Sequence, residues 1–300
     1  MITERLSNGV IELDVTRDFG PRIIRFAFIG GQNHMLTIPD ELQTDATTST
    51  PDTTFPDPIF KCRGGHRLWV APELVPGTYY PDNSPVDITR TAHTLTATAP
   101  TESTGLQKQL HIELAGDASA RITHTLWNRS AWPVEVSIWA LTMMAPGGLG
   151  LTGFPPRGAH PEMLPPTNPL IMWAFSDFTD PRLTLTKRFL TLQQNPALSH
   201  PNKFGLWNPN TWGAYLLHNE LFLKQTTALP NTRYPDHGAS FEIWVNGSTL
   251  ELETLSPLHT LTPGSSITHT EHWSLHRPST LDAVTDESLA RLLATTGLTL

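Results

Sequence analysis

Two glutamates alternate with leucines in segment 249–257, TLELETLSP. Successive side chains of a β-strand point to opposite faces, so we expect Glu251 and Glu253 on one face and Leu250 and Leu252 on the other. A buried pair of carboxylates is costly unless other groups compensate its charge. This face therefore either meets solvent or lines a polar cleft.

Segment 60–73, FKCRGGHRLWVAPE, gathers a second set of reactive side chains around a Gly-Gly turn that lets the backbone approach a ligand closely. The forked donors of Arg63 and Arg67 can bind a hydroxyl or a carboxylate of a ligand, or can form ordinary ion pairs. His66 is a candidate acid or ligand contact, or a residue that holds the loop. Trp69 is a candidate stacking surface for a ligand or a core residue, and Glu73 adds a carboxylate.

Four later residues are further candidates for substrate contacts. Lys203 and Lys224 lie in expected strands, where lysines usually face water. Asp236 lies in the turn YPDHG. Glu242 precedes the Asn-Gly turn at 246–247, which predicts a hairpin that places Glu242 beside the strand of Glu251 and Glu253.

The thirteen histidines raise the question of a metal site, but their spacing does not favour one. His269 and His272 flank Glu271 in an expected strand, so the two imidazoles face opposite ways. We also find no cysteine pair, Walker loop or nucleophile elbow. The sequence therefore predicts no metal and no cofactor.

Composition narrows the class of partner. The formal charge of −8, the pI near 5.9 and the lack of a basic cluster argue against nucleic acid or an anionic membrane as a partner. The amino terminus shows no secretion signal, no stretch is apolar enough to cross a bilayer, and Cys62 has no second cysteine to pair with. We expect a cytoplasmic protein whose partner is a small neutral or modestly charged ligand; the sequence does not indicate its oligomeric state.

Threonine-rich alternating segments with frequent Gly and Pro predict an all-β protein, a single antiparallel β-sandwich domain over residues 1–300 with a C-terminal helix. Residues 40–58 are expected to form a surface loop, residues 147–169 an irregular connection and residues 279–294 the helix. Two further pairings are expected, between 121–130 and 134–144 and between the strand of Glu253 and the strand 268–275. We expect these pairings because the turns at 131–133 and 263–264 connect the two strands of each pair.

The run LET, followed by LTPG and a strand that opens HT, resembles the carboxy-terminal signature of aldose 1-epimerases (galactose mutarotases). The resemblance implies a large β-supersandwich and Glu253 as the catalytic base. The run RGG-x-x-x-W-x-x-P is similar to a segment of the hexose-6-phosphate epimerase branch, which implies a sugar or anion contact for Arg63 or Arg67. The runs GGHRLW, APE and LELETLSP also resemble a family of bacterial proteins of this fold that have no assigned function.

One position departs from the family pattern. Epimerases of this superfamily usually carry a histidine at about Thr142, where it protonates the ring oxygen of the sugar. A threonine hydroxyl donates a hydrogen bond but does not act as an acid near neutral pH. His66 is then the best available acid.

Two hypotheses follow. The first is an aldose 1-epimerase-like isomerase that interconverts sugar anomers by acid–base ring opening, with Glu253 as base and His66 as acid. The second is a non-catalytic protein that binds a sugar or uronate, or a lyase on the same fold, since a fold does not fix a function. The cationic residues favour an anionic sugar under the second hypothesis.

Overall fold

Alternating side chains build two ten-stranded antiparallel sheets in this computed structural model, which describes residues 1–39, 60–74, 77–278 and 280–299. The strands and the α-helix are β1 (Thr3–Ser7), β2 (Ile11–Thr16), β3 (Arg22–Phe28), β4 (His66–Ala71), β5 (Asp87–Arg90), β6 (Thr94–Thr98), β7 (Leu106–Leu114), β8 (Ser119–Asn128), β9 (Val134–Met144), β10 (Leu149–Gly153), β11 (Leu170–Met172), β12 (Leu183–Leu185), β13 (Phe189–Gln193), β14 (Asn202–Leu206), β15 (Asn210–Leu217), β16 (Glu220–Thr227), β17 (Phe241–Val245), β18 (Leu250–Leu255), β19 (His259–Leu261), β20 (Ser266–His276) and α1 (Asp286–Leu293).

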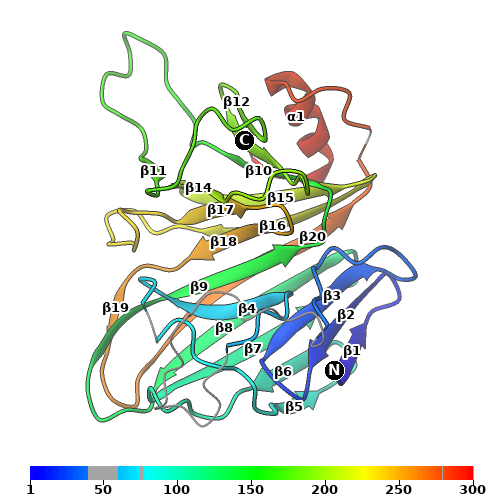
Figure 1. Ribbon diagram of the computed structural model, residues 1–300, viewed down its shortest axis with the longest axis vertical. Helices are drawn as coiled ribbons and strands as arrows, with labels where there is room; N and C mark the ends of the chain where they lie inside the picture. The colour runs from blue at the N-terminus through cyan, green and yellow to red at the C-terminus, as the bar shows by residue number, and fades with distance from the viewer. Residues whose placement is uncertain (40–59, 75–76, 279, 300) are drawn as a thin grey trace.

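The first sheet has the order β1-β2-β3-β4-β9-β18-β17-β14-β11, with β19 paired to β9. The second has the order β12-β13-β10-β15-β16-β20-β8-β7-β6-β5. Both sheets combine strands from the beginning and the end of the chain (Figure 1). This architecture confirms the predicted antiparallel β-sandwich with a C-terminal helix.

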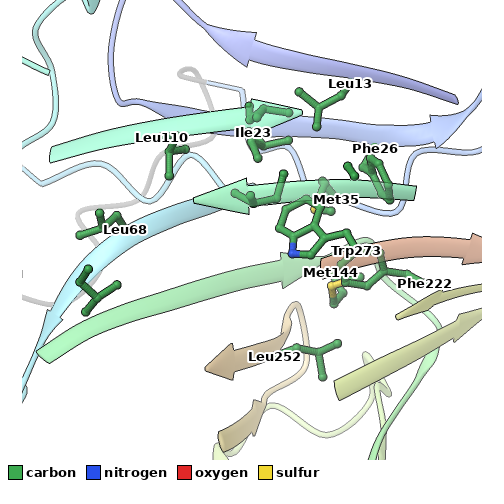
Figure 2. Packing of buried hydrophobic residues seen from close by; sticks show 14 of the residues in the cluster. Leu13, Ile23, Phe26, Met35, Leu68, Leu110, Met144, Phe222, Leu252 and Trp273 are labelled. Atoms are coloured by element: carbon green, nitrogen blue, oxygen red, sulfur yellow. The ribbon is translucent and has the colours of Figure 1, made fainter. Parts of the chain in front are cut away.

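The main hydrophobic core lies between the two sheets. Phe26 from β3 and Phe222 from β16 pack edge-on against the indole of Trp273 on β20, with ring centroids 5.4 and 5.2 Å apart. Figure 2 shows Trp273 among residues contributed by both sheets, including Met144 and Leu252. Such aromatic contacts add to the stabilisation from apolar burial, so this core fixes how the two sheets face each other.

The helix is shorter than predicted. It begins at Asp286, because Thr285 has an extended backbone and its side chain accepts a hydrogen bond from the backbone N–H of Ser288. Leu281 and Val284 pack against the same apolar cluster as α1 without being helical, which explains why their spacing suggested an earlier start. The buried leucines of the helix share an apolar cluster with residues of β10, β13, β15 and β16, so the helix packs on the second sheet (Figure 1). No described helix is long and apolar enough to cross a membrane.

Three expected connections were wrong. β8 and β9 are consecutive but belong to different sheets, and the side-chain amide of Asn128 donates to the carbonyls of Trp132 and Leu261 where the chain crosses over. β20 likewise joins β16 and β8 in the second sheet and does not pair with β18. The segment 147–169 contains the buried strand β10, and the predicted loop at 40–58 lies outside the described residues.

Candidate functional site

A pocket of about 540 Å³ lies on the face of the first sheet that points away from the second sheet. Five neighbouring strands, in the order β4, β9, β18, β17 and β14, contribute alternate residues to this face. The pocket is lined by Ile38, Phe60, Cys62, Arg67, Trp69, Glu73, Tyr79, Trp139, Leu141, Met143, Trp173, Phe175, Pro201, Lys203, Trp244, Asn246, Ser248, Thr249 and Glu251.

Strand register places the two predicted glutamates on this face. Glu253 lies opposite Glu242 of β17 on one side and Leu141 of β9 on the other. Glu251 lies one pair further along, between Trp244 and Met143. The predicted common face of Glu251 and Glu253, and the neighbouring position of Glu242, are therefore confirmed.

Lys203 joins three of these strands through a buried ionic cluster. Its ammonium lies 2.6 Å from Oε2 of Glu242 and 2.9 Å from Oε2 of Glu253. The indole N–H of Trp139 donates to the same oxygen of Glu253 at 2.8 Å. Glu242 and Glu253 are fully buried and do not line the pocket, whereas Lys203 and Trp139 do. The carboxyl of Glu253 therefore lies directly behind the pocket wall.

Burial and ionic contacts shift the pKa values of this cluster in opposite directions. Burial lowers the pKa of Lys203, but the carboxylates of Glu242 and Glu253 outweigh it, so the net pKa is raised. Burial raises the pKa of Glu242 well above its usual value, and the charge of Glu253 adds to this rise while the Lys203 ammonium opposes it. Lys203 therefore keeps its positive charge, which contacts the carboxyls of both Glu242 and Glu253.

Glu251 differs from Glu253 in its surroundings. Its side chain is partly exposed and lines the pocket. Burial and then the nearby charge of Glu253 raise the pKa of Glu251 to about 8, while Arg67 and Lys203 oppose the shift. Strand β18 thus places two carboxyls with different environments next to each other.

Arg67 contributes a buried guanidinium to the pocket. The residue is 3% exposed, and its guanidinium carbon lies 3.8 Å from the ring centroid of Trp69. Its Nη1 contacts the sulfur of Met143 at 3.4 Å, and its Nε has no hydrogen-bond partner among the described residues. Because sulfur is a weak acceptor, strong hydrogen-bond capacity remains for a ligand.

Aromatic rings form the wall around these charges. Trp69 packs against Tyr79 and Trp139 with centroid distances of 5.1 and 5.3 Å. The Lys203 ammonium lies 4.7 Å from the Trp139 ring and 4.6 Å from the Trp173 ring. Flat aromatic faces beside charged groups suit a ligand that has both apolar C–H surfaces and hydroxyls.

Three other predicted residues have different places. Glu73 lines the pocket and accepts a hydrogen bond from the hydroxyl of Tyr79. Arg63 is buried away from the pocket lining and donates to the side-chain carbonyl of Asn83 at 2.6 Å. Asp236 lies in a turn with positive φ, outside the pocket lining. The structure therefore does not bring Arg63 or Asp236 to the pocket.

The expectation that His66 and Lys224 share a site with Glu253 needs correction. His66 pairs with Thr142, and both are fully buried on the opposite face of β4 and β9 from Arg67 and Leu141. Lys224 is fully buried in the second sheet, where its ammonium donates to the Thr142 hydroxyl and the Ala140 carbonyl at 2.9 Å each. Thr142 thus faces the inter-sheet core, so neither it nor His66 reaches the pocket.

These core residues form a directed chain of hydrogen bonds, which we call the inter-sheet network (Lys224, Thr142, His66, His124 and Glu271). Nδ1 of His124 must carry its proton, because it donates to the His269 carbonyl at 2.9 Å. Nε2 of neutral His124 then accepts from Nε2–H of His66 at 2.6 Å. Nδ1 of His66 in turn accepts from the Thr142 hydroxyl at 2.8 Å.

Burial lowers the pKa of both His66 and His124, which agrees with this neutral assignment. Lys224 closes the network through Glu271. Its ammonium lies 2.7 Å from Oε1 of Glu271, and the indole N–H of Trp273 donates to Oε2 at 2.8 Å.

His66, His124 and Glu271 bring together the side-chain types that bind zinc, with candidate ligand atoms within 4.8 Å of one another. The Lys224 ammonium already holds the carboxylate, and the two imidazoles already hydrogen-bond to each other. A divalent cation here would lie close to a buried ammonium, which electrostatic repulsion disfavours. We therefore assign the cluster to hydrogen bonding between the sheets.

The sequence left out several pocket residues. Trp139 alternates with Leu141 and Met143 along β9, so strand periodicity could have placed it beside Glu253 once the pairing of β9 with β18 was known. Trp173 and Tyr79 come from irregular segments with no periodic signal. Their positions depend on tertiary structure.

No protein-family model and no curated protein sequence matches this chain. Its structure is similar to a galactose mutarotase-like protein from Lactobacillus casei, with a TM-score of 0.60 and 11% identity over 92% of this chain and 100% of the other. A protein from Synechocystis has a TM-score of 0.58 and 12% identity over 92% and 96% of the two chains.

A galactose mutarotase related enzyme from Lactobacillus acidophilus has a TM-score of 0.56 and 10% identity over 95% of this chain and 99% of the other. At these identities the similarity concerns architecture, and it extends over nearly the whole of each chain. The chain has the galactose mutarotase-like fold.

Proposed function

We propose that this protein is an aldose 1-epimerase-like isomerase that interconverts the anomers of a sugar by acid–base ring opening. The observation that carries the proposal is the pair Glu251 and Glu253 on β18, of which Glu251 lines an aromatic pocket of about 540 Å³ and Glu253 lies directly behind its wall. Ring opening needs a base for the anomeric hydroxyl and an acid for the ring oxygen, and paired carboxyls with different environments can supply both.

Glu253 is the proposed base. The Lys203 ammonium and the Trp139 indole both contact its Oε2, which stabilises a carboxylate anion there. Its Oε1 is buried and has no hydrogen-bond partner among the described residues. In the proposal, Oε1 is the atom that accepts the proton of the anomeric hydroxyl.

Glu253→Gln should reduce anomer exchange about 100- to 10,000-fold, because an amide cannot accept the proton. Magnetisation-exchange NMR on a panel of aldoses and uronic acids measures this rate directly. Glu113→Gln, which changes a carboxyl on β7 paired to Arg121, is the matched control and should exchange like the wild type. Equal rates for wild type and Glu253→Gln would rule out this base.

A second candidate function, binding of an anionic sugar without anomer exchange or a lyase reaction on such a sugar, is favoured by Arg67. This buried guanidinium lines the pocket, and the described part of the chain places no carboxylate within ion-pair distance of it. A uronate carboxylate would supply the missing partner and could bind both arms of the fork.

Arg67→Met should weaken hexuronate binding about 10- to 100-fold, because a charged hydrogen-bonded pair is lost. Binding of the corresponding neutral hexose should change little. Titration calorimetry with both sugars measures the difference, and Arg121→Met on the exposed side of β8 is the control. Equal losses for the charged and the neutral sugar would mean that Arg67 supports the pocket without recognising an anion.

A further inference from the structure

The pocket needs a proton donor that the neighbouring strand does not provide. Leu141 lies opposite Glu253 on β9, and Trp139 and Met143 flank it on the pocket face. A leucine, a methionine and an indole cannot give up a proton near neutral pH. The donor must therefore come from another element of the pocket.

Two polar lining residues are poor donors for a physical reason. Burial and the hydrogen bond to Glu73 hold the pKa of Tyr79 far above neutral pH. The carboxylates of Glu242 and Glu253 raise the pKa of Lys203, so this ammonium keeps its proton. Both residues can orient a ligand by hydrogen bonding but release a proton reluctantly.

Glu251 has the opposite character. It lines the pocket, and the ammonium of Lys203 contacts Glu242 and Glu253 rather than Glu251. Burial and the Glu253 charge raise the pKa of Glu251 to about 8, so its carboxyl is mostly protonated at pH 7. An acid whose pKa lies near the working pH transfers its proton most effectively.

We propose that Glu251 is the general acid of the pocket and that it protonates the ring oxygen while Glu253 deprotonates the anomeric hydroxyl. This assignment rests on the proposed epimerase function. It gives the role expected of His66, or of a histidine at Thr142, to a residue two positions before the base on the same strand.

The protons balance over a complete cycle. Glu251 gives its proton to the ring oxygen as the bond from that oxygen to the anomeric carbon breaks, and Glu253 takes the hydroxyl proton as the carbonyl forms. After rotation about the adjacent carbon–carbon bond, the ring oxygen attacks either face of the carbonyl. Its proton then returns to Glu251, and Glu253 returns its proton to the new anomeric hydroxyl, which restores both groups.

The spacing of Glu251 and Glu253 on β18 fits their proposed roles as acid and base. Residues i and i+2 of a strand lie roughly 7 Å apart and point the same way. The ring oxygen and the anomeric hydroxyl are bonded to one carbon, so two carboxyls on neighbouring positions can approach them from the same side of the pocket. Glu251 and Glu253 have this relation on β18.

The test is the pH profile of anomer exchange between pH 6 and pH 10, followed by magnetisation-exchange NMR for the wild type, Glu251→Gln and Glu251→Asp. The wild-type rate should fall above about pH 8, as Glu251 loses its proton. Glu251→Gln should exchange about 100- to 10,000-fold more slowly at pH 7, and its remaining rate should lack this decline. Glu251→Asp should keep the alkaline decline at a reduced rate, since it retains a carboxyl.

The outcomes separate this assignment from the proposed function. If the wild type exchanges anomers but Glu251→Gln keeps both the wild-type rate and the alkaline decline, Glu251 is not the acid and the epimerase function stands. If no sugar exchanges with the wild type, both proposals fail. Glu113→Gln controls for loss of a carboxyl elsewhere on the surface and should reproduce the wild-type profile.

Discussion

Replacement of Lys224 by methionine is expected to lower the free energy of unfolding by about 3–5 kcal/mol, because it leaves a buried carboxylate without its counter-charge. Lys224 and Glu271 are both fully buried, with Nζ 2.7 Å from Oε1. The ammonium also donates to the Ala140 carbonyl and the Thr142 hydroxyl of the first sheet. This one side chain therefore compensates a charge and links the two sheets.

Urea unfolding followed by tryptophan fluorescence measures the loss. The double variant Lys224→Met/Glu271→Gln should recover part of it, because the charge left behind by the single change is then absent. Lys187→Met, at an exposed position after β12, should change the free energy of unfolding by less than about 0.5 kcal/mol. If Lys224→Met proved as stable as Lys187→Met, the ion pair would not contribute to the fold.

The alternation of polar and apolar residues predicted the structure correctly where the prediction concerned a single strand or hairpin. Segment 134–144 became a strand with the expected bounds, and the hairpin at 246–247 placed Glu242 beside Glu253. These features depend on side-chain period and turn chemistry within a few residues. They were sufficient to find the face on which the pocket lies.

In strand β4, the alternation of side chains does not show which face meets the pocket. All six of its residues are buried, so no polar side marks which face meets the pocket and which meets the core. Alternation separates His66 from Arg67, but only the pairing with β9 reveals that His66 faces the inter-sheet core. The sequence therefore grouped two residues that lie on opposite sides of one sheet.

The same limit applies to the connections. A short turn between two strands favours a hairpin, but β8 and β9 belong to different sheets because β9 pairs with β4 and β18 in the interior of the first. Such pairings join segments that are far apart in the chain, such as 139 with 255. They are decided by burial over the whole molecule.

The Lys203 ammonium contacts the two buried carboxyls of Glu242 and Glu253 and lies close to the indole rings of Trp139 and Trp173. Lys203→Met should slow anomer exchange at least about 100-fold, because the Glu253 carboxylate loses the ammonium that stabilises its charge. It should also lower the free energy of unfolding by about 3–5 kcal/mol, since Glu242 and Glu253 lose their shared partner.

The double variant Lys203→Met/Glu242→Gln distinguishes these two effects. Glu242→Gln leaves one buried carboxyl in place of two without a cation, so part of the stability should return, as urea unfolding would show. Anomer exchange should stay slow, because Glu253 still lacks the ammonium that stabilises its carboxylate. If activity returned together with stability, Lys203 would act only by maintaining the fold. A persistent loss in the refolded protein would mean that its charge keeps Glu253 competent as a base.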